Sequence, residues 1–124
     1  MSITIRRYSK KLVDCLTRGG IAVIPTDTLY GIVGSAYHKK TVEHIYRLRK
    51  RNRKKPMIVL IASPRDVRRF GVVPNVQEKR LMRAWPSAVT ILLPIRSSSF
   101  ATRFDYLHRG SGAIAFRVPA LRSL

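Results

Sequence analysis

Four short runs of apolar residues constrain the fold of this chain more than any other feature of its sequence. They are Ile21–Pro25, Met57–Ala62, Val89–Pro94 and Ala113–Val118. Each run is apolar almost throughout instead of alternating with polar residues, which is the pattern of a strand buried on both faces of a sheet. Because helical patterns lie between the runs, we predict an α/β fold, with a twisted, mostly parallel or mixed sheet and helices on both faces.

Helix signals precede and follow the first run. Leu12 and Leu16 lie one helical turn apart, and the stop signal Gly19–Gly20 follows them. After the run, apolar residues recur every three positions from Val42 to Leu48. We predict a helix at each place, the second one carrying the basic stretch that follows it.

Two capping signatures predict further helices. Ser63 with Asp66, and Asn75 with Glu78, have the three-residue spacing of a capping box. The stretch Ser97–Gly112 has no such periodicity, and we predict that it is a polar loop.

The length of 124 residues is that of one domain with a single hydrophobic core. The longest apolar run, Met57–Ala62, is far shorter than the roughly 20 residues that a membrane span needs. Cys15 is the only cysteine, so neither an intrachain disulfide nor a multi-cysteine metal site is expected. No signal-peptide core follows the N-terminus, and we predict a cytoplasmic protein without a membrane partner.

The charge balance indicates an anionic partner. The chain has 25 Lys and Arg against 6 Asp and Glu, a net charge of +19, and 17 of the cations are Arg. Arginine binds phosphate and carboxylate through two parallel hydrogen bonds, which places nucleotides and nucleic acids first. Genome composition or solubility is the alternative explanation for the charge.

The densest charge lies in Arg47–Pro56, where seven of ten residues are cations and none is an acid. A helix end in solvent, whose dipole favours cations, accounts for two or three of these charges and not for seven. We therefore expect some of them to contact phosphate, either a triphosphate or an RNA backbone.

The segment Pro25–Gly31, with the sequence PTDTLYG, supplies hydroxyls, a carboxylate and a phenol directly after a predicted buried strand. Ligands bind at the carboxyl ends of strands in open α/β sheets, so this segment is a candidate pocket wall. A turn is an equally good interpretation, because Pro, Asp and Gly are common turn formers.

Arg117 interrupts the last apolar run, and burial of its charge requires an anion, either a protein carboxylate or one from a ligand.

Trp85 in WPSAVT (Trp85–Thr90) is predicted to be a core residue followed by a turn. The three histidines lack metal-ligand spacing, and we place each at the surface. No metal site is expected. The sequence has no glycine-rich phosphate loop, paired-carboxylate signature or nucleophile elbow.

Taken in order, PTDTLYG, IYRLRKRNRKKP, WPSAVT and FRVP resemble the YrdC-like family of threonylcarbamoyl-AMP synthases. The resemblance extends from about Leu12 to Pro119. It implies a twisted α/β sheet around a positive cavity, and a nucleotidyltransferase that joins L-threonine, bicarbonate and ATP, with Mg²⁺, into threonylcarbamoyl-AMP and pyrophosphate. That product serves the N6-threonylcarbamoyl modification of adenosine 37 in tRNA, so tRNA and other threonylcarbamoylation proteins are implied partners.

The resemblance also implies a set of site residues. Thr26 matches a contact of the threonine substrate, and Thr28 and Tyr30 line the same wall. Thr90 is assigned to that site, and Arg117 matches the arginine that receives the substrate carboxylate.

The family's Lys-x-Arg phosphate motif falls on Arg49 and Arg51, so an arginine replaces the usual lysine. Lys55 and Pro56 keep the Lys-Pro that follows. These three cations are the expected ATP-binding residues, whereas no catalytic base is assigned.

Two departures from the family pattern change what we expect. Ser87 and Ala88 replace Gly and Pro in the family's Trp-Pro-Gly-Pro motif, which affects the local turn. The family continues after RVP to a Ser-x-Asn-x-Ser-Gly loop that contacts ATP, and no such loop follows here. We therefore expect a single YrdC-like domain over residues 1–124 that is incomplete at its C-terminal end.

Two alternatives to a synthase remain open. A basic module that binds tRNA or double-stranded RNA and has lost catalysis would suit the charge. A related domain also occurs in a carbamoyltransferase of hydrogenase maturation, although the zinc-binding cysteines of that context are absent here.

Overall fold

The computed structural model describes residues 2–4, 10–25 and 30–120. The described residues divide into two compact units, one within residues 2–52 and the other formed by Arg53–Ala120. Among the described helices, none is long and apolar enough to cross a membrane.

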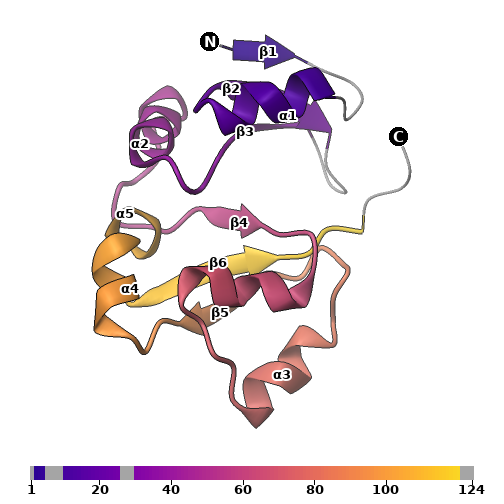
Figure 1. Cartoon of the computed structure of the whole chain (residues 1–124), viewed down its shortest axis with the longest axis vertical. Coiled ribbons are helices and arrows are strands. Elements are labelled where there is room, and N and C mark those ends of the chain that lie inside the picture. The colour runs from indigo at the N-terminus through magenta and orange to yellow at the C-terminus, as the bar shows by residue number, and fades with distance from the viewer. Residues whose placement is uncertain (1, 5–9, 26–29, 121–124) are drawn as a thin grey trace. The chain divides into compact units, whose positions relative to one another are not determined.

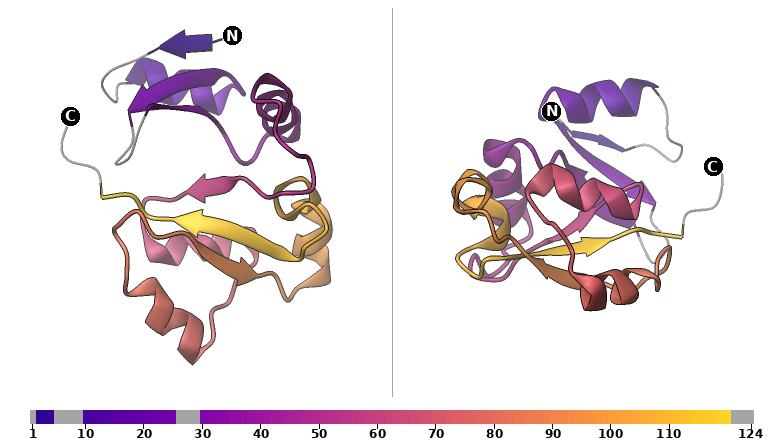
Figure 2. Two further views of the ribbon diagram at one scale, coloured as in Figure 1. Left: turned by 180° about the vertical axis from the view of Figure 1, so that it is seen from behind. Right: turned by 60° about the horizontal axis from the view of Figure 1, so that its bottom comes forward.

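The first unit is a small mixed sheet with two helices. Its described elements are β1 (Ser2–Thr4), α1 (Lys10–Thr17), β2 (Ile21–Pro25), β3 (Tyr30–Gly34) and α2 (Lys39–Leu48). The strand order is β1-β2-β3, with β1 parallel and β3 antiparallel to β2. Figures 1 and 2 show α1 lying across one face of this sheet.

The core of the first unit forms where α1 packs on β2. Leu12 is buried with Ala22 and Ile24, and Leu16 and Val33 pack against this cluster. These are the apolar residues of the predicted first helix and of the first apolar run, so the sequence pattern is confirmed here.

Polar contacts fasten the start of α2 to the turn after α1. Thr41 Oγ1 donates to the carbonyl of Gly19 at 2.7 Å, and His38 Nε2 lies 3.0 Å from the carbonyl oxygen of Thr17. Gly34 permits a close approach, because a Cβ there would lie 2.5 Å from Thr41 Cγ2. These contacts fix the position of α2 on its own sheet.

The second unit contains a mixed sheet and several short helices. Its elements are β4 (Ile58–Leu60), the 3₁₀ helix η1 (Pro64–Phe70), α3 (Val76–Met82), β5 (Ile91–Pro94), α4 (Ser98–Arg103), α5 (Asp105–His108) and β6 (Ala113–Arg117). The strand order is β4-β6-β5, and β6 is parallel to β4 and antiparallel to β5. Figures 1 and 2 show η1 covering one face of this sheet.

An aromatic cluster forms the core between η1, α5 and the central strand. The ring centroid of Phe70 lies 5.1 Å from that of Phe104 and 5.5 Å from that of Phe116. Phe116 and Ile114 of β6, and Leu93 of β5, are fully buried. Aromatic pairs at these spacings add to the stabilisation from buried area, so β6 is the best-anchored strand of the unit.

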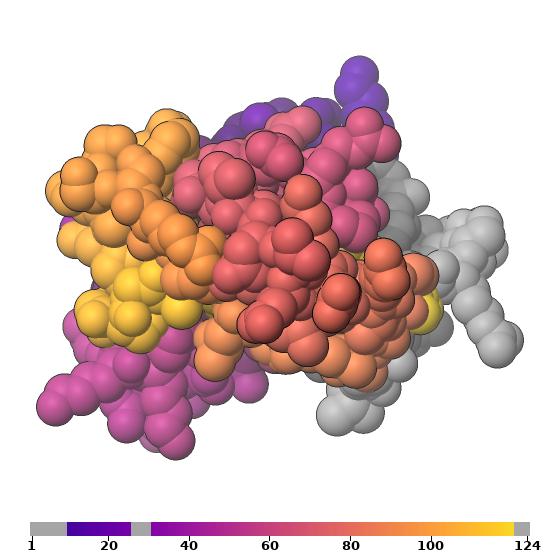
Figure 3. Space-filling view, turned by 90° about the horizontal axis from the view of Figure 1, so that it is seen from below, coloured from indigo at the N-terminus to yellow at the C-terminus, as the bar shows by residue number. Residues whose placement is uncertain are grey.

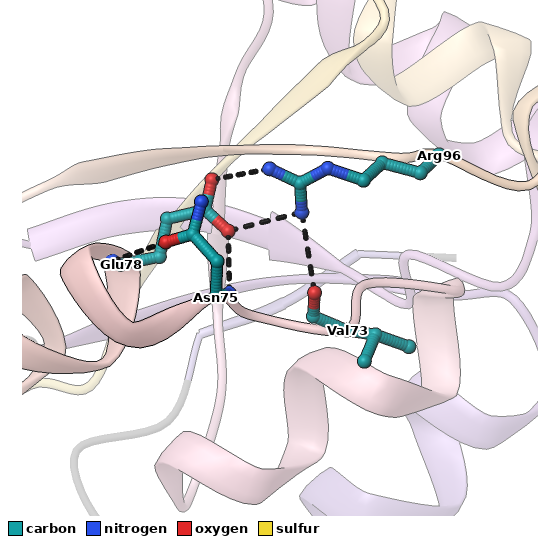
Figure 4. A network of polar contacts seen from close by, with 4 residues as sticks. All are labelled: Val73, Asn75, Glu78 and Arg96. Carbon is teal, nitrogen blue, oxygen red and sulfur yellow. Dashed lines mark hydrogen bonds and ion pairs between the residues drawn. The ribbon is translucent and has the colours of Figure 1, made fainter.

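Both predicted capping boxes are present. Ser63 caps η1 with Asp66, and Asn75 caps α3 with Glu78. Figure 4 shows the second box, in which Asn75 N–H donates to Glu78 Oε1 at 3.0 Å and Asn75 Oδ1 accepts from Glu78 N–H at 2.8 Å. Arg96 joins it through two hydrogen bonds to the Glu78 carboxylate, at 3.0 and 2.9 Å, and one to the Val73 carbonyl.

This network predicts a pH-dependent contribution to stability. Hydrogen bonding from Arg96, and then from the Asn75 amide, holds the pKa of Glu78 below its ordinary value of 4.5. The contribution is therefore complete above pH 4.5 and is lost as the pH falls through the lower folded-state value. We expect the difference in unfolding free energy between wild type and Glu78→Gln to shrink on acidification from about pH 7 to about pH 3, as measured by urea denaturation. A difference that stays constant with pH would contradict the prediction.

The predicted α/β class is confirmed, but several boundaries differ from prediction. The predicted loop Ser97–Gly112 was wrong, because α4 and α5 lie within it. These helices have six and four residues, too few for helical periodicity to be visible. The strand β3 was not predicted, since its glycines, Gly31 and Gly34, weaken the strand pattern.

The predicted burial of two strands was also wrong in part. Ile58 in β4 is 47% exposed, and Leu92 in β5 is 62% exposed. Both strands are edges of the sheet, so each has partly solvated residues that a run of apolar letters does not reveal.

Candidate functional site

The polar segment after β2 begins at a defined position in the first unit. Pro25, the last residue of β2, pairs with Tyr30, the first residue of β3. The predicted site residue Tyr30 thus lies beside the carboxyl end of β2. Thr26 and Thr28 fall outside the described residues, and their roles stay predictions.

The first part of the basic stretch lies at the end of α2. The helix ends at Leu48, with Arg49 as its C-cap, so the prediction that the helix carries the charge run was wrong. Arg51 N–H donates to the Tyr46 carbonyl at 3.1 Å, and Lys50 N–H donates to the Arg47 carbonyl at 3.2 Å. These are the two hydrogen bonds of a Schellman motif.

Lys50 occupies the left-handed position of that motif, with φ of 48°. A residue with a Cβ is disfavoured there, and glycine is usual. The motif turns the chain away from the helix axis between Arg49, which is exposed, and Arg51, which is half-buried. The two predicted phosphate ligands of this unit therefore flank a tight, hydrogen-bonded turn.

Arg117 lies at the carboxyl end of β6 in the second unit. The residue is only 8% exposed, as expected for a cation within an apolar run. Its backbone carbonyl accepts a hydrogen bond from Ile61 N–H at 3.0 Å, and the next carbonyl, of Val118, accepts from Ser87 N–H at 2.9 Å. Hydrogen bonds from both neighbouring segments thus hold the end of β6, and they fix the backbone position of Arg117.

The WPSAVT segment reaches the same end of the sheet. Ile91 is opposite Phe116 in the antiparallel pair, which places Thr90 next to Arg117 in the register. Thr90 is exposed, and the predicted core residue Trp85 is 7% exposed. The second unit therefore brings together two of the predicted substrate-binding residues.

The turn between Trp85 and Thr90 is closed by side chains. Trp85 Nε1 donates to the Val89 carbonyl at 2.7 Å, and Ser87 Oγ accepts from Val89 N–H at 3.2 Å. The peptide bond before Pro86 is cis. Ser87 thus supplies one of the turn's hydrogen bonds through its own side chain.

Lys55 lies in the irregular segment that opens the second unit, and it is exposed. Sequence reasoning missed the residue that contacts this segment, Arg109. Its Nε donates to the backbone carbonyl of Arg53 at 2.5 Å, and its Nη1 donates to the Tyr106 carbonyl at 3.3 Å. No signal in the sequence distinguished Arg109 from the other arginines.

The histidine next to it corrects another prediction. His108 was expected at the surface, but it is buried. Its Nδ1 accepts from the amides of Gly110 and Gly112, at 3.0 and 3.3 Å, and its Nε2 lies 2.6 Å from the Ala101 carbonyl oxygen. A ring nitrogen that accepts carries no proton, so Nε2 is the donor to Ala101. Within the described residues, no group of three His, Cys, Asp or Glu side chains has the arrangement of a metal site.

Comparison with known proteins gives a consistent match. Residues 14–123 match the Sua5/YciO/YrdC family model, which is described as telomere recombination. A threonylcarbamoyl-AMP synthase of Marinobacter nauticus is 32% identical over 110 residues, covering 86% of this chain and 56% of that protein. One of Bacillus subtilis is 29% identical over 105 residues, covering 84% of this chain and 30% of that protein.

The fold has a counterpart among solved structures. P. abyssi Sua5, in a crystal structure of its complex with L-threonine, matches 98% of this chain and 36% of its own, with a TM-score of 0.73 and 23% identity. This likeness supports the α/β fold. The chain thus spans about half or less of the length of the proteins compared with it here.

Proposed function

This chain belongs to the Sua5/YciO/YrdC family, and on that premise we propose that it provides the threonine-binding and phosphate-binding part of a threonylcarbamoyl-AMP synthase. We take residues 1–124 as one family domain. The observation that carries the proposal is the buried Arg117 beside Thr90 at the carboxyl end of β6. A guanidinium there suits a small carboxylate ligand, because both partners are planar and bind through two hydrogen bonds.

Threonine would enter with its carboxylate on Arg117, with Thr90 beside it in the register of β5 and β6. Thr26, Thr28 and Tyr30 remain proposed contacts of threonine. Burial strengthens the ion pair, since the effective dielectric constant is lower than in water. The charge of Arg117 then selects an amino acid with a free carboxylate.

In the reaction that we propose, the threonine amine and bicarbonate form a carbamate with loss of water. A carbamate oxygen then attacks the α-phosphorus of ATP, and pyrophosphate leaves as the P–O bond breaks. The protein has little covalent chemistry to perform, so positioning and charge neutralisation supply most of the rate. We assign the neutralisation to Arg49, Arg51 and Lys55, with Mg²⁺ entering as part of the ATP complex.

The product would supply the N6-threonylcarbamoyl modification of adenosine 37 in tRNA. The reactive mixed anhydride would pass to other threonylcarbamoylation proteins, which are the partners that we propose. A cytoplasmic location fits this role.

Two measurements test the proposal. Isothermal titration of L-threonine into the chain should show saturable binding, and D-threonine should bind much more weakly. Pyrophosphate release from ATP should depend on both threonine and bicarbonate. Absence of L-threonine binding would refute the proposal.

The phosphate assignment gives a separate prediction. Replacing Arg49 and Arg51 together by Ala should weaken ATP binding about tenfold or more, because each charge-assisted contact is worth about 1.5 to 3 kcal/mol. The matched control is Lys10 and Lys11 to Ala, which removes the same charge from the start of α1. Equal losses from the two variants, measured by titration calorimetry, would mean that only bulk charge matters.

Binding of tRNA or double-stranded RNA is a second candidate function, favoured by exposed cations on η1 and α3. Figure 3 looks onto the face where α3 reaches the surface. The exposed cations of the two helices and the turn after α3 are Arg65, Arg68, Arg69, Lys79, Arg80 and Arg83. Such a cluster neutralises backbone phosphates without reading bases.

This second function predicts a steep salt dependence. RNA affinity should fall about a hundredfold or more between about 50 and about 200 mM salt. Replacing Arg65, Arg68 and Arg69 by Gln should lower the slope of log affinity against log salt by about 2 to 3. Fluorescence anisotropy measures both quantities, and an affinity that does not change with salt would refute RNA binding by this surface.

A further inference from the structure

The basic segment that opens the second unit is tethered by a side chain from far along the chain. Arg109 Nε reaches the Arg53 carbonyl, 56 residues away in sequence, at 2.5 Å. Lys55 follows only two residues after this carbonyl. An irregular segment with a fixed point so near has fewer backbone conformations, so the place from which the Lys55 side chain extends is restricted.

The tether has a rigid base. Arg109 N–H donates to the Asp105 carbonyl at 2.8 Å, which closes the last turn of α5. After Arg109, the backbone N–H groups of Gly110 and Gly112 donate hydrogen bonds to His108 Nδ1, and these bonds fix the chain that follows Arg109. Arg109 is therefore held firmly at its backbone while its side chain extends to the basic segment.

Arg109 occupies a backbone conformation that suits glycine better. Its φ is 57° and its ψ is 35°, in the left-handed region, where a Cβ is unfavourable. Gly110, directly after it, also has a positive φ, of 88°. The local backbone therefore favours glycine at position 109, and the hydrogen bonds of the guanidinium explain why an arginine is found there.

We propose that Arg109 is a positioning residue for phosphate binding, acting through the Arg53 carbonyl on Lys55. This inference rests on the proposed function of Lys55 as a ligand of the ATP phosphates. The guanidinium orders the segment before the ligand arrives, so that less conformational freedom is lost on binding. Its contribution is therefore one of geometry and not of bulk charge.

The variant Arg109→Gly separates the tether from the stability of the fold. Glycine accepts the left-handed backbone at no steric penalty, so thermal denaturation should show a midpoint no lower than that of wild type. Tryptic cleavage after Arg53 and Lys54 should be faster, as followed by mass spectrometry. The affinity for inorganic tripolyphosphate, measured by calorimetry, should fall about tenfold.

Two further variants serve as controls. Lys10→Ala removes an equal charge from an exposed position on α1, and it should leave tripolyphosphate affinity within about twofold of wild type. Arg109→Lys keeps the charge and one donor group, and it should restore part of the affinity. If Arg109 only stabilised the fold, Arg109→Lys would not restore any tripolyphosphate affinity relative to Arg109→Gly.

Either of two results would overturn the inference. One is unchanged cleavage after Arg53 and Lys54 in Arg109→Gly, and the other is a tripolyphosphate affinity equal to that of Lys10→Ala. The variant Lys55→Ala tests the premise separately. If its tripolyphosphate affinity equals that of wild type, the assignment of Lys55 in the proposed function fails, and the inference fails with it.

Discussion

Replacing Arg117 by Ala is expected to abolish threonine binding while leaving the fold largely intact. Arg117 is 8% exposed, and its backbone carbonyl accepts a hydrogen bond from Ile61, while the carbonyl of Val118 accepts one from Ser87. Loss of one partner from a buried, hydrogen-bonded charge pair costs about 2 to 5 kcal/mol of binding free energy, a loss of at least about 30-fold in affinity. Titration calorimetry with L-threonine measures the effect.

The control is Arg117→Lys, which keeps the charge but not the planar fork. We expect it to bind threonine at intermediate affinity, since an ammonium makes a point contact with a carboxylate. A different outcome has a defined meaning. If Arg117→Ala keeps full threonine affinity and loses about 3 to 5 kcal/mol of unfolding free energy, Arg117 pairs with an acid of the protein instead.

Gly71→Ala is expected to cause the largest loss of stability among single methyl additions to the second unit. Gly71 ends η1 with φ of 82°, and a Cβ there would lie 2.3 Å from Phe100 Cγ and 2.4 Å from Phe100 Cβ. Overpacking costs about 1 to 3 kcal/mol, and the left-handed backbone adds about 1 to 2 kcal/mol. Urea denaturation should show a loss of roughly 3 kcal/mol or more.

Gly110 provides a matched control for the part of the stability loss that comes from the left-handed backbone conformation alone. Gly110 has φ of 88°, and a Cβ there would have nothing within 4 Å, so Gly110→Ala should lose only about 1 to 2 kcal/mol. Adding Phe100→Ala to Gly71→Ala should remove the contact with the Phe100 ring, whereas the contact with Cβ of residue 100 and the backbone strain remain. Equal losses from Gly71→Ala and Gly110→Ala would show that Phe100 moves aside freely.

The sequence predicted those elements whose pattern depends on local chemistry. The strand Ile21–Pro25 matches its apolar run residue for residue. Both capping boxes follow from a Ser or Asn three residues before an acid, because the two hydrogen bonds are made within one turn. Features set by distant neighbours were not predictable in this way: Leu92 is exposed because β5 is an edge strand, which depends on the order of the sheet.

In the candidate site, too, the sequence predicted what depends on local pattern and not what depends on distant neighbours. Arg117 could be predicted because a cation inside an apolar run is unusual by itself, and the structure buries it. Arg109 and His108 could not, since their partners are backbone atoms that composition does not identify. The partner of Arg109 lies 56 residues away, so its role depends entirely on how the second unit folds.

The closed turn after Trp85 makes the chain suitable for optical measurement. Trp85 is the only tryptophan in the sequence, and its indole N–H is bonded to the carbonyl of Val89, directly before Thr90. Indole emission depends on hydrogen bonding and local polarity, so its wavelength and intensity report on this one turn. A ligand that settles against Thr90 and Arg117 would therefore change the intrinsic fluorescence of the protein, without any label attached.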